Sequence, residues 1–126
     1  MPDFKKYFII PAAPEELYAA LTFKPTIELW TGSPAVFTAE VGSEFSLWDD
    51  NISGNNRILE PGKLIEQEWY FGERDQPSIV RMKLHEHPKG TSLEVNHTNI
   101  PEEDFDDIVA GWQEMYIGSL MDFYRD

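Results

Sequence analysis

Only one stretch of the chain has the hydrophobic pattern of a long helix, and it lies between Pro101 and Asp126. Its apolar residues recur at spacings of three and four, which places them on one face at about 100° per residue. Those residues are Phe105, Ile108, Val109, Trp112, Met115, Tyr116, Leu120 and Phe123. A helix of about 22 residues is about 33 Å long. Such a face is too large to be left in water, so the rest of the chain is expected to cover it.

The first part of the chain predicts a strand followed by two short helices. Residues 4–10 are aromatic and β-branched, and Pro11 ends the strand that they predict. One short helix is expected to begin at Pro14 and a second after Pro25, since proline suits the first turn of a helix. The apolar residues of the second helix are Ile27, Leu29 and Trp30.

From Pro34 to Ile100, short apolar runs alternate with the residues that favour turns. The expected strands cover residues 36–39, 44–48, 57–60, 63–71, 78–86 and 91–99, with a polar loop from Gly72 to Pro77. Strands at this spacing predict an α+β fold, in which a curved antiparallel sheet of about six or seven strands wraps around the long helix.

The last two strands each carry an apolar face of alternate residues. The two faces are Val80, Met82 and Leu84 on one strand and Leu93, Val95 and His97 on the other. Both faces must cover the same core, because a shift by one residue would turn every side chain to the opposite side. The predicted pairs are Leu84 with Leu93, Met82 with Val95 and Val80 with His97, with the turn at His87–Gly90. Arg81, Lys83 and His85 then face solvent.

Length and composition indicate one folded domain with a sizeable core. The chain has 126 residues, 41% of them hydrophobic and none of them cysteine, so disulfides, a thiol nucleophile and a thiolate metal site are excluded. The amino terminus lacks the apolar run of a signal peptide, and no run approaches the length of a membrane span. A cytoplasmic protein is therefore expected.

The net charge of −13, from 23 acidic and 10 basic residues, bears on the partners of the protein. A surface of this sign repels phosphate backbones, and no basic stripe offsets it, so nucleic acid is not an expected partner. Solubility explains the acidity, and a basic protein partner is the alternative.

His97 is the first candidate for chemistry, since the predicted register places it beneath the long helix. A buried neutral histidine can orient a ligand or transfer a proton, although a purely structural histidine is the alternative. Gln67 is expected beneath the helix as well, if Ile65 and Trp69 face inward. Its amide then needs a partner, which is a ligand, a water or another side chain.

Other polar clusters have simpler explanations. His85 and His87 resemble a metal pair on one strand face, but the third histidine is predicted on the opposite face, and a solvated strand edge accounts for them. Alternation sends Glu66 and Glu68 to solvent together with Tyr70, which argues against a carboxylate pair for acid–base catalysis. No metal and no cofactor are expected, because phosphate-loop, serine-nucleophile and zinc-protease motifs are all absent from the sequence.

Two features of the long helix invite a physical reason. Gly111 and Gly118 lie seven residues apart, and each glycine costs about 1 kcal/mol in a helix interior. Close approach to the sheet and a pliable helix that lifts from a cavity are both open explanations. The acidic run from Glu102 to Asp107 is explained by the positive end of the helix dipole.

Four segments of the sequence resemble a known family. They are Ala12–Thr22, Val41–Phe45, Ile58–Ile65 with Trp69 following, and Gly111–Trp112 with Leu120. These resemble the family named after the activator of heat-shock protein 90 ATPase, within the superfamily of START domains and the birch-pollen allergen (SRPBCC). Members of this family more often carry a second glycine where Ser43 lies. The resemblance implies the helix-grip fold.

The resemblance also implies that an apolar or amphipathic molecule, such as a lipid, binds between the long helix and the concave sheet. The expected lining residues are Phe45, Leu47, Ile65, Gln67, Trp69, Val80, Met82, Val95, His97, Trp112, Met115 and Tyr116. The alternative is that the same side chains simply fill the core.

Three functions are consistent with these sequence features. The first is a non-enzymatic protein that binds a small hydrophobic ligand. The second is an acidic protein-interaction module or co-chaperone, although the eukaryotic namesake has an additional N-terminal domain, so the resemblance alone does not carry chaperone activation over. The third is a cyclase- or hydratase-type enzyme, for which only His97, with Tyr116 or Gln67, is available.

Overall fold

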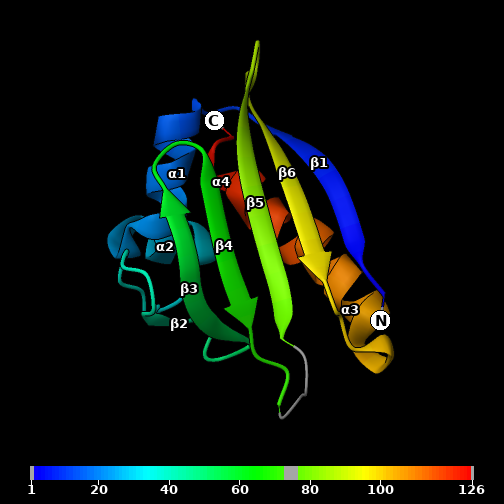
Figure 1. Cartoon of the computed structure of the whole chain (residues 1–126). Coiled ribbons are helices and arrows are strands. Elements are labelled where there is room, and N and C mark those ends of the chain that lie inside the picture. The colour runs from blue at the N-terminus through cyan, green and yellow to red at the C-terminus, as the bar shows by residue number, and fades with distance from the viewer. Residues whose placement is uncertain (1, 73–76, 126) are drawn as a thin grey trace.

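A six-stranded antiparallel sheet curves around a helical layer in the computed structural model, which describes residues 2–72 and 77–125 (Figure 1). The strands are β1 (Phe4–Ile10), β2 (Glu44–Leu47), β3 (Ile52–Glu60), β4 (Leu64–Trp69), β5 (Ser78–His87) and β6 (Gly90–Thr98). Their order across the sheet is β1-β6-β5-β4-β3-β2, so the first strand pairs with the last. The α+β helix-grip prediction is confirmed, with six strands. Residues 73–76 of the predicted polar loop lie outside the described residues.

The two short helices follow the first strand as predicted. They are α1 (Pro14–Thr22) and α2 (Lys24–Thr31), and both lie with the C-terminal helix on one face of the sheet (Figure 1). Gly32 ends α2 with φ of 71°, the left-handed conformation that glycine adopts without a steric penalty. Ile27 and Trp30 are buried, but Leu29 is exposed, so its assignment to the apolar side of α2 was wrong.

The C-terminal helix has a change of winding in its middle. Its segments are η1 (Glu102–Asp104, 3-10), α3 (Phe105–Ala110), η2 (Gly111–Tyr116, π-helical) and α4 (Ile117–Phe123). In η2, the N–H of Ile117 donates to the carbonyl of Trp112, five residues back. Among the described residues, no helix is both long and apolar enough to cross a membrane.

The π-helical segment corrects the predicted apolar face. A π-helix, in which each N–H donates to the carbonyl five residues back, has more residues per turn than an α-helix. Different positions therefore face the sheet after Trp112. Ile117 and Leu120 are buried, whereas Met115 and Phe123 are 41% and 38% exposed. The prediction that Met115 and Phe123 face the sheet was therefore wrong.

The register of the last hairpin is confirmed at every predicted pair. Leu84 lies opposite Leu93, Met82 opposite Val95 and Val80 opposite His97, with His87 and Gly90 closing the turn. The strand predicted at residues 36–39 is reduced to a single bridge between Val36 and Ser46. β3 is longer than predicted and contains a register shift between Asn56 and Ile58.

Candidate functional site

The predicted lining residues converge between the sheet and the C-terminal helix, with one exception. The buried ones are Phe45 and Leu47 on β2, Ile65, Gln67 and Trp69 on β4, Val80 and Met82 on β5, Val95 and His97 on β6, and Trp112 and Tyr116 on η2. Met115 points elsewhere, because the π-helical winding turns it outward.

Aromatic rings occupy the centre of this space. The indoles of Trp69 and Trp112 stack with centroids 4.9 Å apart and an interplanar angle of 15°. The ring of Tyr116 lies 4.7 Å from that of Trp112. Side chains from the sheet and the helix therefore contact one another directly where the sequence predicted a ligand.

Two further tryptophans extend the aromatic cluster, and neither was predicted to belong to it. The ring of Trp30, on α2, lies 5.1 Å from Tyr116, and that of Trp48 lies 6.2 Å from Tyr116. Trp48 follows β2 at φ of 51°, and its indole N–H donates to the carbonyl of Thr31 at 3.0 Å. A tryptophan directly before a polar turn was the only signal in the sequence that could have pointed to it.

His97 is held in the core through both ring nitrogens. The indole N–H of Trp112 donates to Nδ1 at 3.0 Å, so Nδ1 carries no proton. Nε2 lies 2.8 Å from the Ser78 hydroxyl, which donates its own proton to the Thr98 carbonyl at 3.1 Å. The imidazole is therefore the neutral Nε2–H tautomer, and burial lowers the pKa of His97 to about 3.

Gln67 belongs to a second buried chain of hydrogen bonds. Its carbonyl oxygen accepts from the indole N–H of Trp69, and its amide nitrogen donates to Oδ1 of Asn56, both at 3.0 Å. Asn56 in turn donates to the carbonyl of Thr38 at 3.2 Å. Side chains therefore satisfy the Gln67 amide. Residues 53–56 were predicted as a turn or as a bulge inside the next hairpin, and Asn56 lies at the register shift of β3.

The hydroxyl of Tyr116 is different, because no hydrogen-bond partner for it is found among the described residues. The side chain is 3% exposed, and its burial raises the pKa of the phenol. Buried hydroxyls nearly always have a partner, so a hydroxyl without one in the protein is a position at which a water or a ligand atom can bind.

The outer face of the sheet carries two carboxylates that are almost completely covered. Glu66 was predicted to face solvent, and it does lie on the outer face, but its side chain is only 7% exposed beneath Arg57 and Arg81. Glu94 is 9% exposed beneath Lys5 and His85. Hydrogen bonds from Asn96 and His85 lower the pKa of Glu94 to about 2.

His85 and His87 engage separate hydrogen-bond partners. His85 contacts Glu94 at 2.9 Å, and Nδ1 of His87 accepts from the backbone N–H of Lys89 at 3.1 Å. Within the described ranges, no group of three or more metal-ligating side chains is found.

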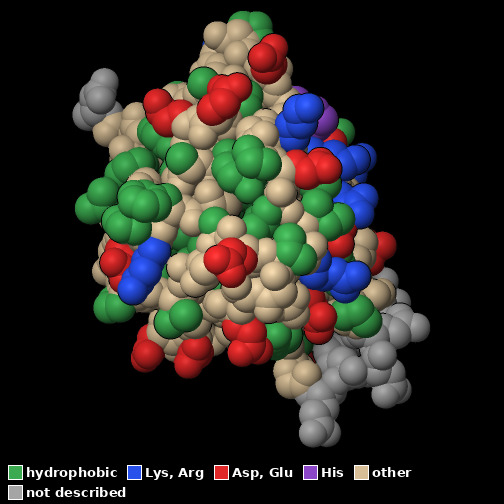
Figure 2. All heavy atoms as spheres, turned by 60° about the vertical axis from the view of Figure 1, so that its left-hand side comes forward, with side chains coloured by type: hydrophobic (Ala, Val, Ile, Leu, Met, Phe, Trp, Pro, Cys, Tyr) green, Lys and Arg blue, Asp and Glu red, His purple; other side chains and the backbone are tan. Residues whose placement is uncertain are grey.

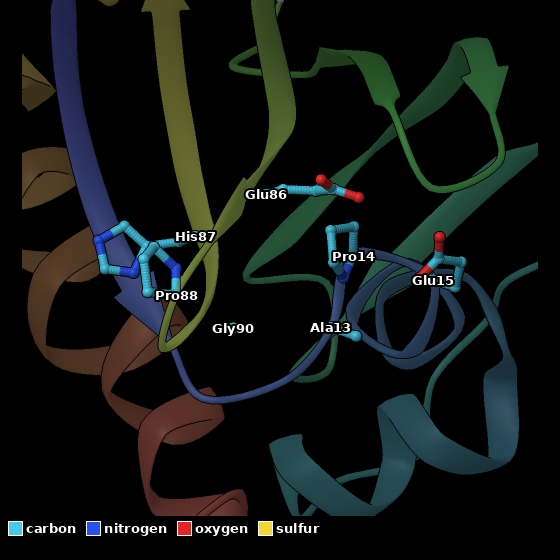
Figure 3. A pocket seen from close by; sticks show the side chains of 7 residues that line it. All are labelled: Ala13, Pro14, Glu15, Glu86, His87, Pro88 and Gly90. Atoms are coloured by element: carbon cyan, nitrogen blue, oxygen red, sulfur yellow. The ribbon is translucent and has the colours of Figure 1, made fainter.

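A surface pocket of about 580 Å³ separates the β5–β6 turn from the start of α1 (Figure 3). Glu15 and Glu86 line it on the side of α1, while the His87 ring lies on the other side of the turn. A side chain at Gly90 would collide with the backbone of Ile10 and Ala12, so glycine is required there for close approach. The pocket is a solvated hollow beside two carboxylates.

Comparison with known proteins gives one consistent result. Residues 11–123 match the model of the family described as "Activator of Hsp90 ATPase homolog 1-like protein". The human protein "Activator of 90 kDa heat shock protein ATPase homolog 1" is 30% identical over 110 residues, which is 86% of this chain and 32% of that protein. The chain thus spans about a third of the length of the curated relatives that it matches.

Solved structures share the fold. A crystal structure of an Hsp90 activator from Plasmodium falciparum superposes with a TM-score of 0.83 at 23% identity, covering 94% of this chain and 92% of that one. The solution structure of an Aha1 dimer from Colwellia psychrerythraea gives a TM-score of 0.81 at 20% identity, covering 97% and 95%.

Proposed function

The chain belongs to the Activator of Hsp90 ATPase homolog 1-like family, and we propose that it acts as a co-chaperone that binds an Hsp90-class chaperone and stimulates ATP hydrolysis. The observation that carries this proposal is the 30% identity to the human activator over 86% of the chain. The filled aromatic core is consistent with this proposal, because a core filled by side chains leaves the protein surface as the place where a partner binds.

Exposed apolar side chains on the helical side support a protein-binding surface. Phe23, between α1 and α2, is 58% exposed, and Leu29 on α2 is 70% exposed. Figure 2 shows hydrophobic side chains gathered on the side of the molecule that carries these helices. Large exposed apolar groups of this kind typically mark interaction sites.

The test is the rate of ATP hydrolysis by the purified Hsp90-class chaperone of the same organism as purified chain is added. We expect the rate to rise to a plateau, and an inhibitor that blocks the chaperone's ATP site to abolish the increase. Because the chain carries a charge of −13, binding to a basic surface should also weaken as salt is added.

Two matched variants locate the contact. Leu29→Ser removes an exposed apolar group on α2 and is expected to weaken binding about tenfold, as interface anchors do. Val41→Ser is the control, since Val41 is 67% exposed but lies in the loop before β2. Absence of both binding and stimulation at about 100 μM, where even weak complexes form, would exclude this function.

The unpartnered hydroxyl of Tyr116 favours a second candidate, the binding of a small hydrophobic molecule. The rings of Trp30, Trp48 and Trp112 lie next to the Tyr116 ring, so a ligand with an aromatic or apolar body and one polar atom is complementary to this environment. The ligand's polar atom would pair with the hydroxyl, and displacement of Trp48 would make room for its apolar body.

Native mass spectrometry of protein purified from its own host tests this candidate, together with amide-shift titration against lipids and aromatic metabolites. A retained mass, or shifts clustered at Trp69, His97, Trp112 and Tyr116, would support it. Tyr116→Phe should then weaken the same ligand, since the ring is kept and only the hydroxyl is lost. No retained mass and no core shifts would exclude it.

A further inference from the structure

A groove of about 570 Å³ runs across the outer face of the sheet, opposite the helices. It is lined by Lys5, Ile79, Arg81, Lys83, Asn96 and Thr98, with the covered carboxylates Glu66 and Glu94 at its floor. We call this surface the outer groove. Figure 2 shows Lys and Arg side chains gathered along the edge where this face of the sheet turns out of view.

The charge presented by the outer groove is positive although the molecule is strongly acidic. Arg81 donates to one oxygen of Glu66 through Nε at 2.9 Å, and Arg57 lies 3.3 Å from the other oxygen. The side chains of Arg57 and Arg81 are nearly half exposed, while the carboxylate side chain between them is covered. A partner that approaches the groove therefore meets the cations first.

Glu94 is covered by hydrogen-bonding neighbours and one cation. Its two oxygens are engaged by His85 and Asn96, and the ammonium group of Lys5 lies 3.9 Å away. Glu68, the remaining carboxylate on this face of β4, lies opposite Ile79, which lines the same groove.

Lys83 is the cation of this groove that forms no ion pair within the described part of the chain. It lies opposite Leu64 on β4 and Glu94 on β6, and no ion pair or hydrogen bond to its ammonium group is found among the described residues. Beyond the hydrogen bond from Asn96, the charge of Lys83 helps to lower the pKa of Glu94, but without an ion pair between Lys83 and Glu94 the ammonium group can still bind an anion.

We propose that the outer groove binds an acidic peptide segment of a partner protein. Carboxylates of the segment would pair with Lys83, Lys5 and the free N–H groups of Arg81, and an apolar side chain would rest on Ile79. A short segment fits better than nucleic acid, because a polyanion that extends beyond the groove meets the acidic remainder of a molecule with a charge of −13. The proposal concerns the opposite face from α2 and does not depend on the chaperone assay.

The test is an amide-shift titration of the purified full chain with a blocked pentapeptide of two glutamates, one isoleucine and two glutamates. At about 25 mM salt, where screening is weak, shifts are expected at outer-face positions of β4, β5 and β6. The matched peptide with four glutamines in place of the glutamates should produce none of them.

Lys83→Gln should weaken the peptide about fivefold, which corresponds to the loss of one near-surface charge contact. Lys24→Gln on α2 is the control with the same charge change away from the groove, and its affinity should stay within about twofold of the original. Both substitutions remove exposed or half-buried cations for which the described part of the chain shows no ion pair, so thermal melting should confirm that both variants remain folded.

Three results would overturn the proposal. The first is the absence of outer-face shifts with the glutamate peptide. The second is equal weakening by Lys83→Gln and Lys24→Gln, which would mean diffuse attraction to the whole molecule. The third is an equal affinity, with the same shifts, for a short single-stranded DNA, which would assign the groove to polyanions in general.

Discussion

At the scale of single residues, the buried hydroxyl of Tyr116 gives a direct prediction about stability. A buried polar group without a partner costs free energy, so Tyr116→Phe should raise the free energy of unfolding by about 1 kcal/mol. Urea denaturation followed by tryptophan fluorescence measures the change. A loss of stability would show that a bound water or ligand already satisfies the hydroxyl.

His97 predicts how stability depends on pH. Burial lowers the pKa of His97 from 6.5 to about 3, so the unfolded chain binds a proton between these values while the folded chain does not. Stability from this residue is therefore fully present above pH of about 6.5 and is lost as the pH falls toward the folded pKa. The loss between pH 7 and pH 4 should be about 3 kcal/mol.

The control for this prediction is His97→Gln, which can still accept from Trp112 but does not titrate. Carboxylates protonate in the same pH range, and both proteins share that effect, so the difference between their unfolding free energies isolates His97. Parallel pH curves for the two proteins would mean that folding does not lower the pKa of His97.

The sequence predicted where His97 and Gln67 point but not what they contact. Strand alternation determines the side of the sheet, and that inference needs only neighbouring residues. The partners Ser78 and Asn56 come from other strands, and their approach depends on the curvature of the sheet and the bulge in β3. The local sequence indicated a turn or a bulge at residues 53–56, but which side chains meet there is set by tertiary packing.

At the scale of elements, the two helical glycines and one strand glycine should respond differently to alanine. A Cβ at Gly111 would meet no atom within 4 Å, so Gly111→Ala should stabilise the protein by about 1 kcal/mol through helix propensity. A Cβ at Gly54 would lie 1.8 Å from the Glu68 carbonyl oxygen, so Gly54→Ala should strongly destabilise β3 and β4. Thermal melts of both variants provide the comparison, with Gly118→Ala as an intermediate case.

A loss of stability in Gly111→Ala would point to a functional role for the π-helical segment. Such segments occur frequently at functional sites, and alanine favours the tighter α-helical winding over η2. A destabilised variant would therefore mean that the protein depends on the wider winding that places Trp112 and Tyr116 in the core.

The long helix also shows where pattern reasoning stops. Its existence and most of its apolar residues were predicted from spacings of three and four, and Trp112, Tyr116 and Leu120 are buried as that spacing predicts. Met115 and Phe123 fit the same spacing but are exposed, because one π-helical turn shifts the face. A periodicity of 3.6 residues assumes uniform winding, so a local change of winding is invisible to it.

At the scale of the whole molecule, charge is distributed unevenly between the two sides. The outer face of the sheet holds Lys5, Arg57, Arg81 and Lys83 above the covered carboxylates Glu66 and Glu94 and beside Glu68, whereas acidic residues open the C-terminal helix at Glu102–Asp107. Composition predicted the total charge but not this segregation, which arises because the cationic strand positions from β1, β3 and β5 meet only after the sheet forms. A partner with a positively or a negatively charged binding surface therefore meets a face of opposite charge on this protein.

This imbalance predicts that added salt stabilises the protein. Self-repulsion among the excess carboxylates destabilises the folded state, and screening by salt reduces it. Screening also weakens the pairs on Glu66 and Glu94, but these carboxylates are covered and are screened less than the exposed majority. The melting temperature should therefore rise as sodium chloride increases from about 20 mM to about 200 mM.

Two exposed carboxylates provide the matched variant for this prediction. Glu40 lies in the loop before β2 and Glu114 on η2, and no ion pair is found for either one within the described ranges. Glu40→Gln combined with Glu114→Gln should raise the melting temperature at low salt and flatten its dependence on salt, because less repulsion remains to be screened. A melting temperature that falls with salt in the original chain would instead mean that the pairs beneath the outer groove outweigh the repulsion, and that this face is the main electrostatic support of the fold.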